Sequence, residues 1–153
     1  MGQYAESISS ALKQNGFADC EIWGEPGRAL VAESESLLTR IELSKPGRLY
    51  LNDGGFGTLY DAVNVRWSFP IRAIKRSGEP SATLIPYRLH GPTCDPEDRW
   101  PEATMLPENL EEGDWLEFGQ TGAYGSAMAS RFNGFGALSH AEVLDAPFES
   151  AYA

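Results

Sequence analysis

The chain has 153 residues, of which 42% are hydrophobic and 22% charged, so it is long enough to form one folded domain with its own core. Its net charge of -10 argues against a nucleic-acid partner, because phosphate binding needs a basic face. No apolar run approaches the ~20 residues of a membrane span, and the first residues lack the basic and apolar regions of a signal peptide, so we expect a cytoplasmic protein with no membrane partner.

The first 45 residues combine helical and strand patterns. Apolar residues at helical spacing predict a helix over residues 4–14, and Gly16 follows as a stop. Residues 19–23 are expected to form a short strand, and an apolar stripe over residues 29–41 predicts a second helix directly after it. A strand flanked by two helices is an unusual start for a β domain. We therefore interpret residues 1–45 as the remnant of a larger α/β barrel domain.

From residue 46 to residue 153 the pattern changes to short β-like runs separated by Gly, Pro, Asn and Asp. It predicts a mainly β (α+β) fold whose C-terminal domain is an antiparallel β-sandwich or Greek-key barrel. Nine of the 10 prolines lie there, which favours a turn-rich β body. The predicted strands cover residues 48–51, 71–75, 83–89, 115–118 and 141–144, whereas residues 100–112 are expected to be irregular and residues 146–153 to form a tail.

Glu25-Pro26-Gly27-Arg28 stands where the predicted strand ends and a helix begins, which is where α/β barrels present their functional groups. An arginine at a helix N-terminus can grip a phosphate bidentately, helped by free backbone N–H groups. A carboxylate three residues earlier can pair with a protonated ring nitrogen. From spacing alone, an ordinary Glu–Arg surface pair at a tight turn explains the same residues.

A thiol, a carboxylate, a hydroxyl and two rings stand at loop-like positions between residues 91 and 135. Cys94 can serve as a proton donor or nucleophile and Asp95 can bind an ammonium group, although a lone cysteine is more often an inert buried residue. Tyr124, between two glycines, can offer its hydroxyl to a ligand. Phe132 and Phe135 either face a ligand or belong to the core.

Two further patterns carry no chemistry of their own. The glycine-rich run at residues 52–57 lacks the Lys-Ser/Thr ending of a P-loop, so a hairpin or a close approach between chain segments explains it better. The two cysteines form no CxxC pair, and no pair of Cys or His residues has zinc spacing. We therefore expect neither a disulfide framework nor a metal site.

Taken in order, these motifs resemble the C-terminal portion of one family, the pyridoxal-phosphate-dependent ornithine, diaminopimelate and arginine decarboxylases. Each motif is short, but six of them occur in the family's order and span most of the chain. The matching pieces are Glu25-Pro26-Gly27-Arg28, Asn52-Asp53-Gly54, Gly91-Pro92-Thr93-Cys94-Asp95 with Asp98, Gly113-Asp114-Trp115, Gly122-Ala123-Tyr124 and Phe132-Asn133-Gly134-Phe135.

The resemblance implies a cofactor, pyridoxal 5'-phosphate, and four residues that bind it. Glu25 would keep the pyridine nitrogen protonated, so that the ring can act as an electron sink. Arg28 and Tyr124 would bind the cofactor phosphate, and Gly27 would belong to the same cofactor-binding turn.

The resemblance also implies a substrate site. Cys94 would return a proton to the substrate α-carbon after carbon dioxide leaves, Asp95 would bind the distal ammonium of a diamino acid, and Phe132 would line the pocket. Aspartate after the cysteine is similar to the ornithine branch, so the implied reaction converts ornithine or lysine to a diamine for polyamine biosynthesis. A second acid would fall near residues 64–65 by ungapped count, where no carboxylate stands.

In this family the site is shared across a homodimer, which implies that Cys94 and Asp95 serve a different subunit from Glu25 and Arg28. The family's cofactor lysine belongs to a barrel of roughly 250 residues, of which this chain carries only what resembles the last helix, strand and helix. None of the chain's lysines stands in the expected context.

We therefore expect the chain by itself to be inactive, as a fragment or as one half of a pair that associates with a barrel-bearing partner. The alternative is a non-catalytic regulatory or binding module related to the decarboxylases, similar to antizyme inhibitors. A β-sandwich lectin or adaptor is a more distant third.

Overall fold

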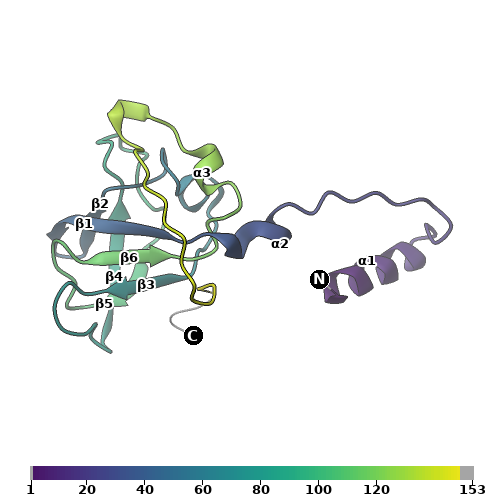
Figure 1. The fold of residues 1–153 in the computed structure, drawn as a ribbon, viewed down its shortest axis with the longest axis horizontal. Coiled ribbons are helices and arrows are strands. Elements are labelled where there is room, and N and C mark those ends of the chain that lie inside the picture. The colour runs from purple at the N-terminus through teal and green to yellow at the C-terminus, as the bar shows by residue number, and fades with distance from the viewer. Residues whose placement is uncertain (1, 149–153) are drawn as a thin grey trace.

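The computed structural model describes residues 2–148 and shows a six-stranded mixed sheet from which an N-terminal arm extends (Figure 1). Within the sheet the strand order is β3-β6-β1-β2-β4-β5. All neighbours are antiparallel except β2 and β4, which run parallel, so the expected mainly β fold is confirmed with one parallel pair that the antiparallel expectation lacked. The strands are β1 (Leu37–Lys45), β2 (Arg48–Leu51), β3 (Ile71–Ile74), β4 (Leu84–His90), β5 (Thr104–Pro107) and β6 (Trp115–Phe118).

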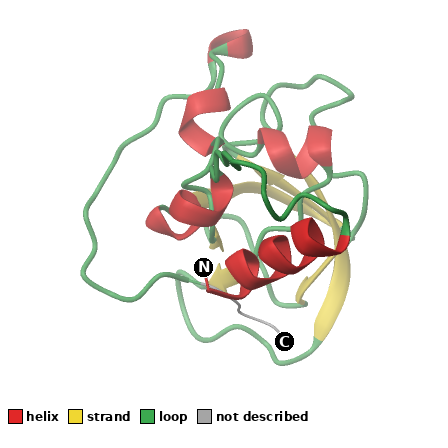
Figure 2. Cartoon of the chain, turned by 90° about the vertical axis from the view of Figure 1, so that its right-hand side faces the viewer, coloured by secondary structure: helices red, strands yellow, loops and turns green. Residues whose placement is uncertain are grey.

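Helices are short except for the first, and they lie outside the strands (Figure 2). No helix within residues 2–148 is long and apolar enough to cross a bilayer. The α-helices are α1 (Gly2–Gln14), α2 (Arg28–Val31) and α3 (Gly125–Met128), and single turns of other helix types occupy Ala32–Ser34, Asp61–Val65 and Phe132–Gly134.

The predicted second helix is wrong beyond Ser34, because the chain continues as β1. Along β1 the side chains of Leu37, Thr39 and Ile41 are buried while those between them are exposed, which is the period of two that a strand requires. β1 pairs with both β2 and β6, so the sheet begins at Leu37 and not at residue 46. The assignment of the preceding residues to a barrel stays a prediction.

Two further strand predictions are wrong. Residues 19–23 and 141–144 form no strand, and Trp23 and Leu144 are among the most exposed large side chains of the described chain. A single extended segment is stable only when a neighbour satisfies its backbone groups, and neither segment pairs with another within residues 2–148. Conversely, β5 forms inside the stretch predicted to be irregular, as an edge strand that pairs with β4 and ends at Pro107.

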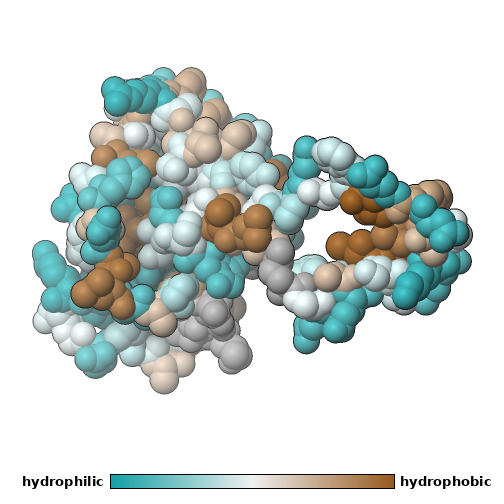
Figure 3. Space-filling view, turned by 45° about the vertical axis from the view of Figure 1, so that its right-hand side comes forward, coloured by the Kyte–Doolittle hydropathy of each residue, from teal (hydrophilic) through white to brown (hydrophobic). Residues whose placement is uncertain are grey.

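The predicted first helix is confirmed as α1, but none of its residues is buried. Tyr4 and Ile8 are 66% and 55% exposed, although their spacing is that of a core-facing stripe. Figure 3 shows apolar side chains gathered on the inner side of the arm. The buried core is formed mainly by side chains of the sheet strands, among which Ile41, Leu89 and Phe118 have no exposed surface.

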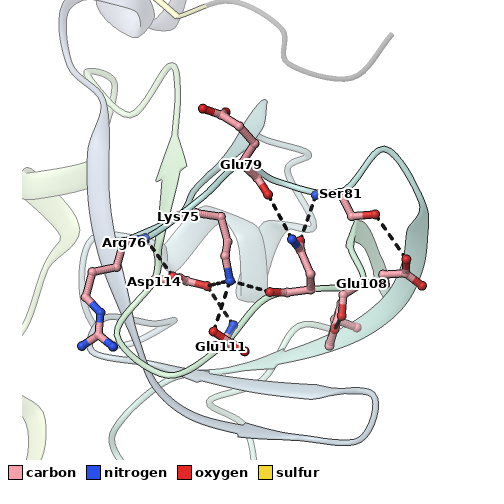
Figure 4. A network of polar contacts seen from close by, with 9 residues as sticks. Lys75, Arg76, Glu79, Ser81, Glu108, Glu111 and Asp114 are labelled. Atoms are coloured by element: carbon pink, nitrogen blue, oxygen red, sulfur yellow. Dashed lines mark hydrogen bonds and ion pairs between the residues drawn. The ribbon is translucent and has the colours of Figure 1, made fainter.

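A buried ion pair fixes the end of β3 to the turn before β6 (Figure 4). Lys75 Nζ lies 2.8 Å from the Asp114 carboxylate, and the two side chains are only 6% and 4% exposed. The same carboxylate accepts hydrogen bonds from the backbone N–H of Arg76 and Glu111, at 2.9 and 2.8 Å. Lys75 also donates to the Asn109 carbonyl at 2.6 Å, so both charges are satisfied without water.

Candidate functional site

Four residues gather around Arg28, and we call the five together the arginine cluster: Gly27, Arg28, Asp61, Trp67 and Tyr124. The Arg28 guanidinium pairs with the Asp61 carboxylate and lies 4.3 Å from the centre of the Trp67 ring and 5.3 Å from that of Tyr124. Its side chain is 23% exposed, so ring faces and a carboxylate replace most of its water. Three of the predicted cofactor-binding residues are therefore brought together.

The arginine cluster is positioned by the docking of α2 onto the loop after β6. The backbone N–H groups of Thr121 and Gly122 donate to the carbonyls of Glu35 and Ala32, both at 3.0 Å. A side chain at Gly122 would come within 2.1 Å of the Val31 carbonyl, so only glycine permits this approach.

Tyr124 follows this loop with a φ of 66°, a left-handed conformation that turns the chain into α3. The Tyr124 side chain points back to the start of α2. Its hydroxyl lies so close to Gly27 that a Cβ on this residue would stand 2.9 Å from it.

One buried side-chain atom of the arginine cluster has no hydrogen-bond partner among the described residues. Nη1 of Arg28 is buried and makes no hydrogen bond within the described chain, whereas Nη2 serves Asp61. A buried donor left unpaired is costly, and in folded proteins an ordered water, an ion or a ligand supplies the missing acceptor. Beside it lies a pocket of about 610 Å³, with Trp67, Gln120 and Tyr4 of α1 on its walls. An unpaired guanidinium donor and a nearby phenol hydroxyl are donors that suit a phosphate group, so these residues fit the cofactor that the sequence implied.

The loop of residues 91–98, which we call the cysteine loop, holds the predicted catalytic thiol. Cys94 is exposed and has a φ of 58°, and Asp95 is half-buried and accepts a hydrogen bond from the Glu97 N–H at 2.8 Å. Both residues border a mainly apolar pocket of about 720 Å³, which Tyr50 and Phe135 also line. This pocket and the one beside Arg28 have no lining residue in common.

The predicted ring Phe132 lies next to the cysteine loop and not in the arginine cluster. It stacks on Phe56 with ring centroids 4.5 Å apart and is 41% exposed. Ser130 holds the same segment in place, because its hydroxyl donates to the Phe56 carbonyl at 2.7 Å. Phe132 is thus neither plain core nor isolated, and its partner comes from the glycine-rich run at residues 52–57.

That run is a structural turn, as its missing P-loop ending indicated. The Asp53 carboxylate accepts hydrogen bonds from the N–H groups of Gly54 and Thr58 at 2.6 and 2.9 Å, and burial raises its pKa. A Cβ at Gly57 would meet the Asp53 carboxylate at 1.9 Å, and one at Gly55 would meet Val63. The expected close approach of chain segments is confirmed.

Glu25 is the predicted residue that the structure does not bring into either group. It is exposed on the segment that joins α1 to α2. That segment forms no strand in the described chain, so within the described residues Glu25 is linked to Arg28 only through Pro26 and Gly27.

Sequence reasoning missed two residues of the sites. Asp61 is 8% exposed, pairs with Arg28 in the arginine cluster, and lies shortly before residues 64–65, where ungapped counting found no carboxylate. His90 lines the pocket by the cysteine loop and stacks on Tyr50 at 4.7 Å. Burial lowers the pKa of His90 most, and the positive charges of Arg48, Arg99 and Arg88 lower it further, so the neutral form is favoured.

The chain is similar to known proteins over most of its length. A family model described as the C-terminal sheet domain of pyridoxal-dependent decarboxylases matches residues 30–122. Antizyme inhibitor 2 of Xenopus laevis is 35% identical over 134 residues, covering 77% of the chain and 29% of that protein. Diaminopimelate decarboxylase of Helicobacter pylori is 35% identical over 133 residues, covering 85% of the chain and 31% of the enzyme.

Solved structures agree with these sequence matches. The lysine/ornithine decarboxylase of Vibrio vulnificus, complexed with cadaverine, superposes with a TM-score of 0.59 and 36% identity, over 72% of the chain and 30% of that enzyme. The chain therefore spans 29% to 31% of the length of these three proteins.

Proposed function

Because the chain belongs to the pyridoxal-dependent decarboxylases through its C-terminal sheet domain, we propose that it supplies part of the cofactor and substrate site of a decarboxylase that acts on a diamino acid. The observation that carries the proposal is the buried Nη1 of Arg28, which makes no hydrogen bond within the described residues and belongs to a guanidinium that lies over the Tyr124 ring. A phosphate oxygen is an acceptor that would satisfy this charged donor.

Arg28 and Tyr124 would bind the phosphate of pyridoxal phosphate, with Gly27 leaving room for the Tyr124 hydroxyl. Asp61 and Trp67 would orient the guanidinium, so that Nη1 points to the ligand while Nη2 stays occupied. Glu25 would hold the proton on the pyridine nitrogen, as the segment before α2 orders around the cofactor. When bound, pyridoxal phosphate supplies an electron sink for breaking the bond to the substrate carboxylate.

The cysteine loop would complete the reaction. Cys94 Sγ would donate its proton to the substrate α-carbon once carbon dioxide has left, and Phe132 would help to exclude water from that carbon. Asp95 would bind the distal ammonium. Asp61 would be the second carboxylate for that ammonium, because Arg28 uses only its Oδ2 and leaves Oδ1 without a partner in the described chain. Two carboxylates favour ornithine or lysine as the substrate, with a diamine as the product.

We further propose that the site is completed across a homodimer or with a barrel-bearing partner. The pocket by Cys94 and the pocket by Arg28 share no residue, which supports a site whose two parts come from different subunits.

Residues 1–153 by themselves would be inactive, since each lysine is unsuited to hold the cofactor. Lys13 lies in the last turn of the exposed helix α1, Lys45 lies over the Tyr50 ring, and Lys75 is buried against Asp114.

A second candidate function is a regulatory or binding module without catalysis. The similarity to antizyme inhibitor 2 favours it. It predicts that Arg28 and Cys94 can be replaced without loss of function, whereas the decarboxylase proposal requires both.

Phosphate binding by Arg28 can be tested with two ligands. In the assembled decarboxylase, Arg28→Ala will weaken pyridoxal phosphate binding by about 10- to 100-fold, because a charged hydrogen bond to the phosphate is lost. Binding of pyridoxal, which has no phosphate, will change little. Titration calorimetry with both ligands measures the difference, and Arg48→Ala, an exposed arginine of β2, is the matched control. Equal weakening of the two ligands would show that Arg28 acts on the fold and not on the phosphate.

A further inference from the structure

The backbone of Cys94 is held in an unusual conformation. Its φ of 58° is left-handed, which costs a residue with a Cβ free energy and persists only where the surroundings impose it. The thiol itself is exposed and makes no hydrogen bond within the described chain. Whatever fixes the direction of this side chain must therefore act through the backbone of the cysteine loop.

The Asp98 carboxylate is the centre of that loop. It is 2% exposed, and its Oδ2 accepts hydrogen bonds from both the N–H and the hydroxyl of Thr93, at 3.1 and 2.6 Å. Its Oδ1 accepts a third bond from the Gly55 N–H at 2.8 Å, which lies in the turn after β2. The Asp98 side chain thus connects the residue that precedes Cys94 to Gly55, which lies 43 residues before Asp98 in the chain.

Two glycines leave space for this carboxylate. A Cβ on Gly54 would stand 2.3 Å from Asp98 Oδ1, and one on Gly91 would stand 2.2 Å from the same oxygen. Backbone bonds close the loop around it, because the Gly91 N–H donates to the Asp98 carbonyl at 2.9 Å and the Asp98 N–H donates to the Asp95 carbonyl at 3.0 Å. The Asp98 carboxylate is therefore packed between the turn after β2 and the backbone of the cysteine loop.

Asn133 joins a third segment to the same point. Its side-chain Nδ2 donates to the Thr93 carbonyl at 3.0 Å, and its own φ is 53°. The adjacent Phe132 stacks on Phe56, which belongs to the turn that Asp98 already holds through Gly55. Thr93 is thus held on its N–H and hydroxyl by Asp98 and on its carbonyl by Asn133, so the peptide that leads into Cys94 is fixed from both sides.

We propose that Asp98 and Asn133 are positioning residues that hold Cys94 in its left-handed conformation and so set the direction of its thiol together with the position of the Phe132 ring. The inference rests on the proposed function in one respect, namely that the thiol so aimed is the proton donor. The geometry of the loop itself is a property of the 153-residue chain.

The backbone ¹³C chemical shifts of Cys94, which report a left-handed φ, test the proposal in the full chain. Asp98→Asn replaces one of the two acceptor oxygens by an NH2 donor, so the bonds to Thr93 and to Gly55 cannot both be kept; the Cys94 shifts will move toward extended values, and the Thr93 or the Gly55 amide proton will exchange with solvent about tenfold faster. Glu97→Gln, an exposed carboxyl one residue away, is the matched control and will change neither.

A second variant keeps the test decisive if Asp98→Asn does not fold. Asn133→Gly tolerates the positive φ but removes the bond to the Thr93 carbonyl, so the Cys94 shifts will move while the Gly55 amide keeps its slow exchange. Left-handed shifts at Cys94 in Asn133→Gly and in any folded Asp98→Asn would overturn the positioning role.

Activity then separates this inference from the proposed function. In an assembled decarboxylase, Asp98→Asn will lower kcat/KM by about 10- to 100-fold, because small misplacements of a reacting group are costly, while affinity for pyridoxal phosphate stays unchanged. If the shifts move as expected but the unmodified assembly releases no carbon dioxide from a diamino acid, the positioning role stands and the decarboxylase proposal fails. Unchanged kcat/KM in a folded Asp98→Asn assembly would overturn the positioning role.

Discussion

Replacement of Cys94 by alanine will lower the kcat of decarboxylation by about 10²- to 10⁴-fold, the range expected when a general acid is removed. The physical reason is that Cys94 is exposed at the rim of its pocket and is held in one backbone conformation, as a proton donor must be. Alanine keeps the backbone and removes only the thiol. Formation of the diamine from ornithine or lysine by the assembled enzyme measures the effect, because Cys94 acts after carbon dioxide has left.

The second cysteine provides the control. Cys20 is also exposed, but it lies on the segment between α1 and α2, outside both groups of site residues, so Cys20→Ala will leave kcat unchanged. A Cys94→Ala enzyme that keeps most of its kcat would remove Cys94 from the mechanism, whatever the cofactor affinity.

The same variant tests whether the site is shared between subunits. If Cys94 and Arg28 of one chain serve different sites, mixing Cys94→Ala with Arg28→Ala, at a pyridoxal phosphate concentration too low to fill the Arg28→Ala site, restores one intact site in each mixed dimer. Random mixing makes half of the dimers mixed, and each has one intact site of two, so about a quarter of the activity returns. No recovery would place both residues in the same site.

Loss of the Asp114 carboxylate will have the largest effect on stability. Asp114→Ala will lower the free energy of unfolding by about 3 to 5 kcal/mol, because it leaves the buried cation of Lys75 without its main partner. Two backbone N–H groups, of Arg76 and Glu111, lose their acceptor as well. Urea unfolding followed by tryptophan fluorescence measures the change. The exposed carboxylate of Glu42, which pairs with Arg40, is the matched control, and Glu42→Gln will have a far smaller effect.

This pair also gives stability a pH dependence of known sign. Burial opposes the charge on Asp114, but hydrogen bonds from Lys75 and the backbone outweigh burial and lower the pKa of the carboxyl. A lowered folded-state pKa stabilises the protein above the ordinary value of about 3.9 and loses that stabilisation as pH falls through the folded value. The stability difference between the natural protein and Asp114→Asn will therefore shrink below about pH 4. A difference that is constant from pH 7 to pH 2 would contradict the ion pair.

Much of the sheet could be predicted from the sequence, because most of its strands carry strong local signals. β2 and β6 lie where the β-like runs between glycines and prolines placed them. The residues of β1 predict a helix because Leu37, Leu38 and Ile41 have helical spacing. Leu37 and Ile41 also fit the period of two of a strand, and the burial of Thr39 between them shows that the strand period applies. β5 carries little apolar pattern of its own, and its pairing with β4 decides its structure.

In the candidate site, too, some residues carry local sequence signals and others depend on contacts that only the fold creates. Arg28, Cys94 and Tyr124 could be found from short motifs, since each stands in a turn-like run that contains glycine. Asp98 and Asn133 could not be given a role, because their function depends on contacts with Thr93 across 5 and 40 residues of sequence. Such side-chain contacts depend on how the chain folds, and they produce no periodic pattern in the sequence.

The central claim is that this sheet domain supplies Cys94 and Arg28 to a decarboxylase site whose cofactor lysine lies outside residues 1–153. The direct measurement is diamine formation from ornithine and lysine by residues 1–153, with pyridoxal phosphate, in the presence and absence of a family barrel that carries the cofactor lysine. We expect the diamine only when both polypeptides are present, and loss of its formation with Cys94→Ala. Turnover by residues 1–153 alone, with a borohydride-trapped adduct on one of its own lysines, or undiminished diamine formation with Cys94→Ala, would contradict the claim.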